Sequence, residues 1–201
     1  MAGCFSFYPT KNLGGIGDGG MVVTSDASLA AKLRLLRQYG WDRAQHSVIA
    51  GWNSRLDAIQ AAVLEVKLRH LSQMNEQRSA IAGRYNAAFA AVPLGLPLQR
   101  PGSRHVYHLY VVELDDLAQR SSLLSHLAER GVVAGIHYGE GVHSQPTYRA
   151  RLRRSGLIET ESLTQRVLSL PMFPELSLKQ QERVTDAVLQ FFGRRPKGNP
   201  R

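Results

Sequence analysis

The sequence has one cysteine in 201 residues and no long apolar run. A lone Cys4 excludes an internal disulfide framework and a zinc site built from several cysteines, which fits a reducing compartment. No stretch approaches the roughly 20 apolar residues that a membrane-spanning helix needs, and the start of the chain lacks a basic segment followed by an apolar one. We therefore expect a cytoplasmic protein with no membrane contact.

Acidic residues are outnumbered, since 25 lysines and arginines against 16 acidic residues give a formal net charge of +9. Most of the excess lies in two clusters: Arg149, Arg151, Arg153 and Arg154, then Arg194, Arg195, Lys197 and Arg201. No aromatic side chains interleave with either cluster, so we expect a solvated face and a basic tail at 194–201, and no nucleic-acid partner. The seven histidines show no three-ligand spacing, and we expect no metal site.

Lys11 follows Pro9 by two residues and precedes a glycine-dense stretch between Gly14 and Gly20. Proline fixes the backbone and glycines allow close approach, so the sequence predicts a turn that presents the Lys11 amine for Schiff-base chemistry. The alternative is an ordinary exposed lysine. Two motif interpretations fail: an expected strand at Met21–Thr24 follows the glycines where a dinucleotide-binding loop needs a helix, and a P-loop lysine would follow its glycines.

Hydrophobic residues make up 43% of the chain, enough for one domain and part of another. Helical spacing after a cap at Asp26 predicts a helix that ends at Gly40, followed by a loop from Tyr39 to Trp52. The pattern Ser54-x-x-Asp57 predicts a second helix start with Asn53 at its N-terminus, and a break near Leu71-Ser72. The positions expected to face the core of the two helices are Leu29, Leu33 and Leu36, then Leu56, Ile59, Val63 and Leu64.

The later part of the chain predicts a smaller α/β layer after a linker at 93–104. Strands are expected at Val106–Leu114 and Val132–Tyr138, with a helix at Gln119–Arg130 between them that Gly131 closes. A last helix is expected to begin at Ser177 with Gln180 in a capping box. Its inward-facing positions are Val184, Val188 and Phe191.

Three ordered blocks carry a resemblance to a known family. Residues 6–14 (SFYPTKNLG), 17–20 (GDGG) and 51–62 (GWNSRLDAIQAA) resemble the DegT/StrS family of nucleotide-sugar aminotransferases. Three later segments, 107–112 (YHLYVV), 136–138 (IHY) and 170–174 (LPMFP), resemble later blocks of that family in the same order. The resemblance therefore covers nearly the whole chain.

The resemblance implies pyridoxal 5′-phosphate as cofactor, with Lys11 as its catalytic lysine. It places Ser6 at a phosphate-binding serine, and Asn53 at an asparagine that reaches the cofactor phosphate of the neighbouring subunit, so a homodimer with shared active sites is expected. Tyr8, His137 and Tyr138 are the expected substrate-binding residues. Lys11 argues against the related sugar dehydratases, in which histidine replaces the lysine.

The implied fold is α/β: the C-terminal part of the large domain of a fold-type I aminotransferase at 1–92, and the small C-terminal domain at 105–193. Family members are about twice this length, so we expect a C-terminal portion without the N-terminal half of the fold. The implied activity is amino transfer from an amino acid, with glutamate expected, to a nucleotide-linked keto sugar, with a dTDP-3-keto-6-deoxyhexose expected. An inactive fragment or a regulatory relative of the family is the alternative.

Overall fold

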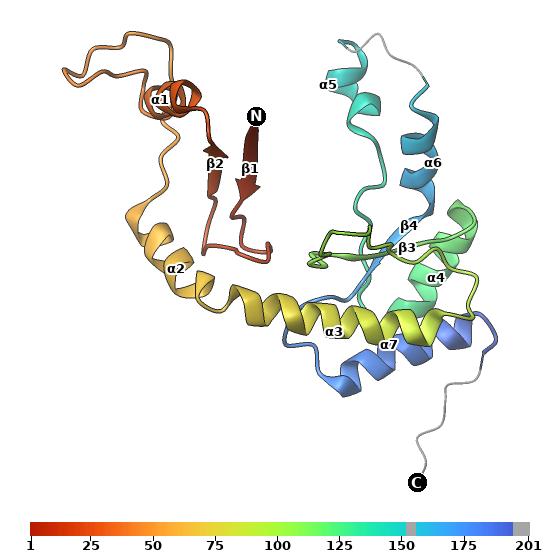
Figure 1. Ribbon diagram of the computed structural model, residues 1–201. Helices are drawn as coiled ribbons and strands as arrows, with labels where there is room; N and C mark the ends of the chain where they lie inside the picture. Colours follow the sequence, from red (N-terminus) through yellow and green to blue (C-terminus); the bar gives the residue numbers. More distant parts are fainter. Residues whose placement is uncertain (152–155, 195–201) are drawn as a thin grey trace. The chain divides into compact units, whose positions relative to one another are not determined.

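The computed structural model of the chain describes residues 1–151 and 156–194 (Figure 1). The chain divides into two compact units, Met1–Met74 and Asn75–Arg201, and each is described by itself. This division falls inside a helix, whereas the sequence places the domain linker at 93–104, and that linker stays a prediction. Arg153, Arg154 and the tail beyond Arg194 lie outside the described residues. No helix of the described part is both long and apolar enough to cross a membrane.

The first unit begins with a β-hairpin. Strand β1 (Ala2–Ser6) pairs antiparallel with β2 (Gly20–Thr24), in a register that runs from Ala2 opposite Thr24 to Ser6 opposite Gly20. The predicted strand at Met21–Thr24 is thus confirmed. The thirteen-residue connection between the strands contains Lys11, so the hairpin positions the residue of greatest interest.

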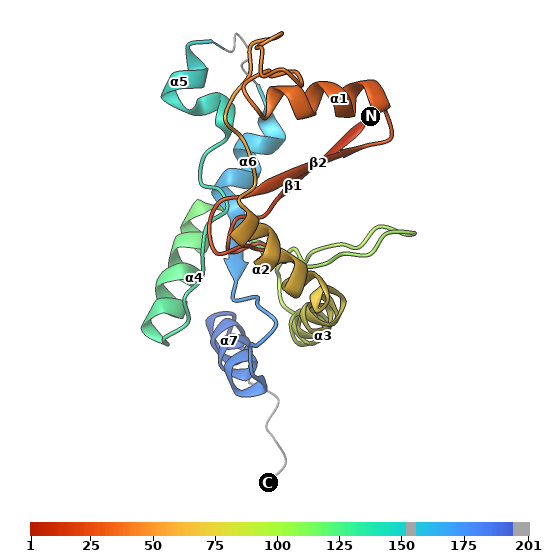
Figure 2. The same cartoon turned by 90° about the vertical axis from the view of Figure 1, so that its left-hand side faces the viewer.

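Helix α1 (Ala27–Leu36) follows β2 and lies beside it (Figures 1 and 2). It begins at the predicted cap, because the Asp26 carboxylate accepts the backbone N–H groups of Ser28 at 2.9 Å and Leu29 at 3.0 Å. These hydrogen bonds, the one from Leu29 foremost, lower the pKa of Asp26. The predicted inward positions of α1, Leu29, Leu33 and Leu36, are half-buried, but no residue of the helix is fully buried, so this face does not form a core in the described chain. A two-stranded hairpin is too small to cover a whole helix face.

Helices α2 (Ala58–Leu68) and α3 (Leu71–Phe89) are separated at Arg69-His70, close to the predicted break. The inward face of α2 agrees with the predicted one at Val63 and Leu64 and differs from it at Ile59. Ile59 is 71% exposed, and the stripe turned toward the rest of the unit consists of Gln60, Val63, Leu64 and Lys67. The sequence pattern missed the two ends of this face, Gln60 and Lys67, because both are polar.

The second unit is built around a small antiparallel sheet. Strand β3 (Tyr110–Glu113) pairs with β4 (Val167–Leu170), with Tyr110 opposite Leu170. Single bridges extend the sheet at both edges, from Gly95 to Glu113 and from Gly135 to Ser169. Segments far apart in the sequence therefore meet in one sheet.

Two predicted strands need correction. The strand predicted at Val106–Leu114 begins only at Tyr110, because Tyr107 has φ of 45°, which extended backbone cannot accommodate. The segment Val132–Tyr138 forms no strand, and its backbone joins the sheet by a single bridge at Gly135, which exchanges backbone hydrogen bonds of 3.0 and 2.7 Å with Ser169. The partner strand of β3 is β4, which sequence reasoning missed.

Helical segments make up much of the rest of the second unit. They are α4 (Leu117–Glu129), the short 3-10 helix η1 (Val142–Ser144), α5 (Pro146–Arg149), α6 (Ile158–Arg166) and α7 (Leu178–Phe191). Helix α4 ends before Gly131 with its φ of 69°, and α7 begins at Ser177 with the predicted capping box. Both predictions are confirmed. Helices α4 and α7 lie side by side in both views (Figures 1 and 2).

Aromatic side chains fill the centre of the second unit. Tyr85 and Phe89 of α3 stack with ring centroids 5.7 Å apart, and Tyr110 of β3 meets Tyr85 edge-on at 5.0 Å. The Tyr110 hydroxyl donates to Asn86 at 2.6 Å, and burial raises the pKa of both tyrosines. Each polar hydroxyl thus has a partner, which lets these rings occupy an apolar core.

Candidate functional site

Lys11 lies in a tight turn that the neighbouring residues hold in place. Its backbone N–H donates to the carbonyl of Tyr8 at 2.9 Å, and Pro9 between them has a fixed φ. Gly14 packs flat against this turn, since a Cβ at position 14 would overlap the carbonyl oxygen of Pro9. Half-buried Lys11 is therefore presented on an ordered turn, as the sequence predicts.

The base of the Lys11 loop is closed by two backbone hydrogen bonds. Phe7 donates to the carbonyl of Gly19 at 2.8 Å, and the N–H of Gly15 donates to the carbonyl of Phe7, also at 2.8 Å. Phe7 is 7% exposed and anchors the loop to the body of the unit. The glycines lead into strand β2 and no helix follows them, so the structure offers no dinucleotide-binding loop here.

Two polar residues of α2 contact the glycine stretch, and sequence reasoning missed both. Gln60 Oε1 accepts the N–H of Ile16 at 2.9 Å, and Lys67 Nζ donates to the carbonyl of Gly14 at 2.5 Å. The glycines thus allow the Gln60 side chain of the same unit to approach the loop closely. A Cβ on Gly15 would lie only 2.5 Å from Gln60 Oε1. The signal that could have found them is their spacing of seven, which puts both on one helix face.

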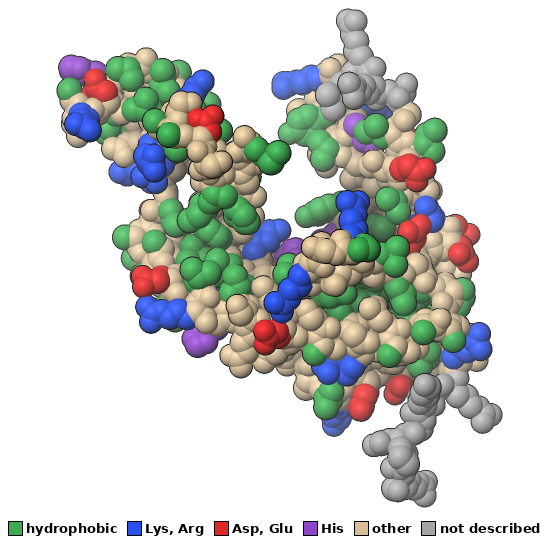
Figure 3. Space-filling model, viewed as in Figure 1, with side chains coloured by type: hydrophobic (Ala, Val, Ile, Leu, Met, Phe, Trp, Pro, Cys, Tyr) green, Lys and Arg blue, Asp and Glu red, His purple; other side chains and the backbone are tan. Residues whose placement is uncertain are grey.

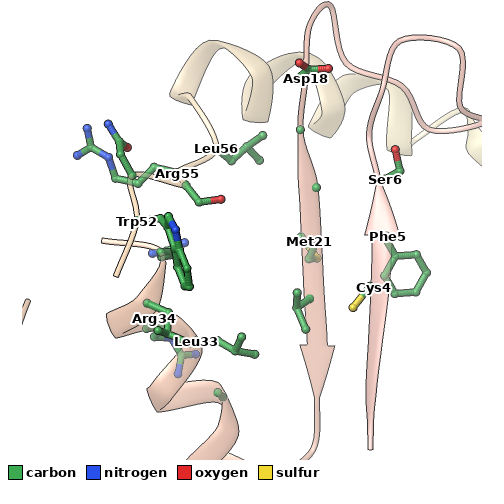
Figure 4. Close-up of a pocket in the computed structure, with 18 of the residues that line it drawn as sticks. Cys4, Phe5, Ser6, Asp18, Met21, Leu33, Arg34, Trp52, Arg55 and Leu56 are labelled. Carbon is green, nitrogen blue, oxygen red and sulfur yellow. The ribbon is translucent and has the colours of Figure 1, made fainter. Parts of the chain in front are cut away.

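A groove of about 1190 Å³ opens beside the hairpin. Figure 4 shows β1 and β2 on one side of this groove and α1 with the segment 52–56 on the other. Three of the six predicted site residues line it: Ser6, Tyr8 and Asn53. Lys11 is not among the lining residues, and it follows Tyr8 by one turn.

Three arginines also line the groove: Arg34 of α1, Arg37 directly after the end of α1, and Arg55 from the segment before α2. Figure 4 labels Arg34 and Arg55. Sequence reasoning placed the basic clusters elsewhere and did not single them out. Guanidinium groups are planar donors that suit phosphate oxygens, and the three carry positive charge into a groove that also offers hydroxyl and amide groups. The groove is therefore suited to an anion.

Asn53 does not lie at a helix N-terminus, so that prediction is wrong. Helix α2 begins after Asp57, whose extended backbone, with φ of −64° and ψ of 143°, precedes the first helical residue. Asn53 instead forms a bridge to Gln38, and the N–H of Ser54 donates to the carbonyl of Arg37 at 2.9 Å. The end of α1 thereby fixes the Asn53 backbone, and its exposed side chain faces the groove from there.

The other two predicted residues belong to the second unit. The His137 ring is held by Ser169, whose Oγ lies 2.9 Å from Nδ1, and Tyr138 meets it edge-on with centroids 5.6 Å apart. Both residues are exposed, Tyr138 at 72%. Ser169 lies in β4, so the sheet positions this pair at its edge.

The sequence profile of the DegT/DnrJ/EryC1/StrS aminotransferase family matches residues 1–189. The chain belongs to this family. A transaminase for dTDP-3-amino-3,4,6-trideoxy-α-D-glucose from Streptomyces venezuelae is 45% identical over 189 residues, which cover 93% of this chain and 49% of that protein. A UDP-N-acetyl-3-dehydro-α-D-glucosamine 3-aminotransferase from Acidithiobacillus ferrooxidans is 40% identical over 186 residues, covering 92% and 49%.

Two solved structures have the same fold as this chain. DesV from S. venezuelae, in complex with a ketimine intermediate, superimposes with a TM-score of 0.90 at 44% identity, covering 96% of this chain and 52% of DesV. NtdA from Bacillus subtilis, with bound pyridoxamine phosphate, gives a TM-score of 0.87 at 27% identity, covering 96% and 46%. The predicted fold class is confirmed, and the chain spans about half the length of the relatives it matches.

Proposed function

We propose that the whole protein transfers an amino group from an amino acid to a nucleotide-linked keto sugar, with pyridoxal 5′-phosphate as cofactor. The observation that carries the proposal is the ordered backbone turn that holds Lys11, in a chain of an aminotransferase family. Tyr8, at the start of this turn, lines a groove that is suited to an anion. Each neighbouring group has a role in this chemistry.

The residues present fit the cofactor. Its phosphate needs donors that fix its orientation, and the Ser6 hydroxyl and Asn53 amide both face the groove. Ser6 Oγ also accepts the N–H of Tyr8 at 3.3 Å, which ties the serine to the start of the Lys11 turn. Ser6 would hold the phosphate and Lys11 the aldehyde end of the cofactor in the chain's own site, and Asn53 would reach the phosphate of the partner's cofactor. When bound, the cofactor supplies an electron sink for the carbon that carries nitrogen.

Lys11 would act as the proton carrier in both half-reactions. As a neutral amine it takes the proton from the α-carbon of the amino acid donor. In the second half-reaction it delivers a proton to the carbon of the sugar that receives nitrogen. The held backbone of residues 8–14 keeps the amine in place for both transfers.

The sugar nucleotide is proposed to contact Tyr8, His137 and Tyr138. Tyrosine hydroxyl and histidine ring nitrogens can donate to sugar hydroxyls, and the side chains of Tyr8 and Tyr138 are about half and nearly three-quarters exposed. A dTDP-3-keto-6-deoxyhexose is the proposed acceptor, and glutamate the proposed donor. The relative at 40% identity favours a second acceptor, a UDP-linked 3-keto N-acetylhexosamine.

A homodimer in the cytoplasm is part of the proposal. Asn53 and Ser6 line one groove in this chain, and Asn53 is proposed to serve the partner's cofactor. The side chain is exposed on an extended segment, which leaves it accessible to another subunit.

The test is turnover by the purified whole protein. With glutamate and each keto sugar in turn, amino-sugar product should form with one nucleotide preferred by tenfold or more. Lys11→Ala should abolish product, while Lys32→Ala, a change at an exposed lysine of α1, should leave it intact. Absence of turnover with both sugars, in a protein that folds and binds the cofactor, would favour a regulatory relative instead.

A further inference from the structure

The loop that follows Lys11 is held by side chains of α2 that the proposed chemistry does not use. Gln60 accepts the Ile16 N–H at 2.9 Å, and Lys67 donates to the Gly14 carbonyl at 2.5 Å. The two residues are seven positions apart, about two helical turns, and form the ends of the inward stripe of α2. The helix is thus hydrogen-bonded to the loop at two points.

The fit between Gln60 and the glycines is close. A Cβ on Gly15 would lie 2.5 Å from Gln60 Oε1, and a Cβ on Gly17 would overlap Gln60 Nε2. Glycine at both positions therefore admits the amide between them. Gln60 supplies the nearest atom to each of these two built Cβ positions. Gly15 and Gly17 thus pack directly against the Gln60 amide.

The second hydrogen bond, from Lys67, holds Gly14, the residue that packs against the Lys11 turn. Gly14 lies against the backbone of Tyr8 and Pro9, and a Cβ there would overlap the Pro9 carbonyl. Its own carbonyl receives the Lys67 ammonium, a charge-assisted hydrogen bond in a partly buried setting. A shift of Gly14 would therefore move the turn whose Lys11 N–H is bonded to Tyr8.

We propose that Gln60 and Lys67 are positioning residues, which fix the loop 14–16 and through it the place of the Lys11 amine. This inference rests on the proposed function of Lys11. Neither side chain needs to touch substrate, since each acts through the backbone of the loop. A reaction slows by up to about a hundredfold when a catalytic group is displaced by 1 Å from its reactive position. Loss of either hydrogen bond to the loop should therefore have a measurable effect on the rate.

The experiment compares variants of the whole protein. Gln60→Ala and Lys67→Met remove the two contacts, while Gln60→Glu keeps the Oε1 acceptor and Lys67→Arg keeps a donor. Gln73→Ala and Lys32→Met are matched controls, because both are exposed helical residues of the first unit. The chain has five lysines, so peptide mapping by mass spectrometry resolves each one.

Two readouts are taken at equal amounts of folded protein. The first is kcat and KM for amino transfer. The second is the rate at which a neutral acylating reagent labels Lys11 without cofactor, as a function of pH. We expect Gln60→Ala and Lys67→Met to lower kcat by about tenfold or more with KM for the sugar nearly unchanged, and to shift the pH profile of Lys11 labelling. Lys67→Arg should restore most of the loss, and both controls should match the parent.

The inference is overturned if Gln60→Ala and Lys67→Met keep the parent's kcat and labelling profile while Lys11→Ala is inactive. Activity retained by Lys11→Ala would instead contradict the proposed function. Should Gln60→Ala fail to fold, Gln60→Leu decides: it removes the Oε1 acceptor of the Ile16 N–H while keeping a side chain of similar length, and a kcat and labelling profile equal to the parent's would count against the role of Gln60.

Discussion

Arg78 offers a direct test of how the second unit is held together. It lies on α3 with 6% of its surface exposed, and its Nη1 donates to the carbonyls of Tyr107 at 3.1 Å, His108 at 3.3 Å and Met172 at 3.0 Å. Burial lowers the pKa of its guanidinium, with Glu175 acting in the opposite direction. One side chain thus joins the segment before β3 to the segment after β4.

The cost of removing this guanidinium can be worked from these contacts. Hydrogen bonds to a charged donor contribute about 1.5–3 kcal/mol each, and one nitrogen with two protons shared among three carbonyls makes the equivalent of two, or about 3–6 kcal/mol. The desolvation of a buried charge offsets part of that, and the buried Nε lacks a hydrogen-bond partner among the described residues. We expect Arg78→Met, which keeps the packing of the stem, to lower the free energy of unfolding by about 3 kcal/mol.

Urea unfolding of the whole protein, followed by circular dichroism, measures this difference. Arg104→Met is the control, since Arg104 is 60% exposed on its side chain and lies 3.9 Å from Glu76, a surface pair that contributes about 0–1 kcal/mol. A loss below about 1 kcal/mol for Arg78→Met would refute the reasoning, because it would mean that the three carbonyls find equivalent partners without the arginine.

Two further predictions concern assembly. If Asn53 serves the partner's cofactor, mixing inactive Lys11→Ala and Asn53→Ala subunits should regenerate some intact sites and restore activity; hybrids as inactive as both parents would exclude shared sites. Separately, the isolated chain should self-associate, because Ile59, Val66 and Leu68 of α2 are 71%, 56% and 56% exposed, and Figure 3 shows hydrophobic side chains gathered around the hairpin and α2. Light scattering tests this, and a cooperatively melting monomer would contradict it.

Local signals predicted much of the fold. Helix caps depend on hydrogen bonds between residues a few positions apart, so the sequence alone can predict them. The predicted helix starts at Asp26 and at Ser177 with Gln180, and the predicted end at Gly131, are all found. Ser54-x-x-Asp57 misled, because Asn53 and Ser54 are held by backbone bonds to the end of α1 that no local pattern encodes.

Non-local pairing accounts for the remaining misses. Strand β4 is defined by its pairing with β3, which lies more than fifty residues earlier in the chain. The segment through Gly135 joins the same sheet by a single bridge to Ser169, so it does not form the predicted strand. At the candidate site, the motif identified Lys11, Ser6 and Asn53 as residues to examine. Gln60 and Lys67 were missed because a polar residue on an inward helix face looks like a solvent-facing one until its backbone partner is known.

The central claim, that Lys11 is the amine that holds the cofactor, is tested most directly by reductive trapping. The whole protein is incubated with pyridoxal 5′-phosphate, reduced with borohydride and mapped by mass spectrometry. The account predicts label on the Lys11 peptide alone, and loss of that label in Lys11→Ala and in Lys11→Arg, whose guanidinium stays protonated. Label on any of the other four lysines, with Lys11 unmodified, would contradict it.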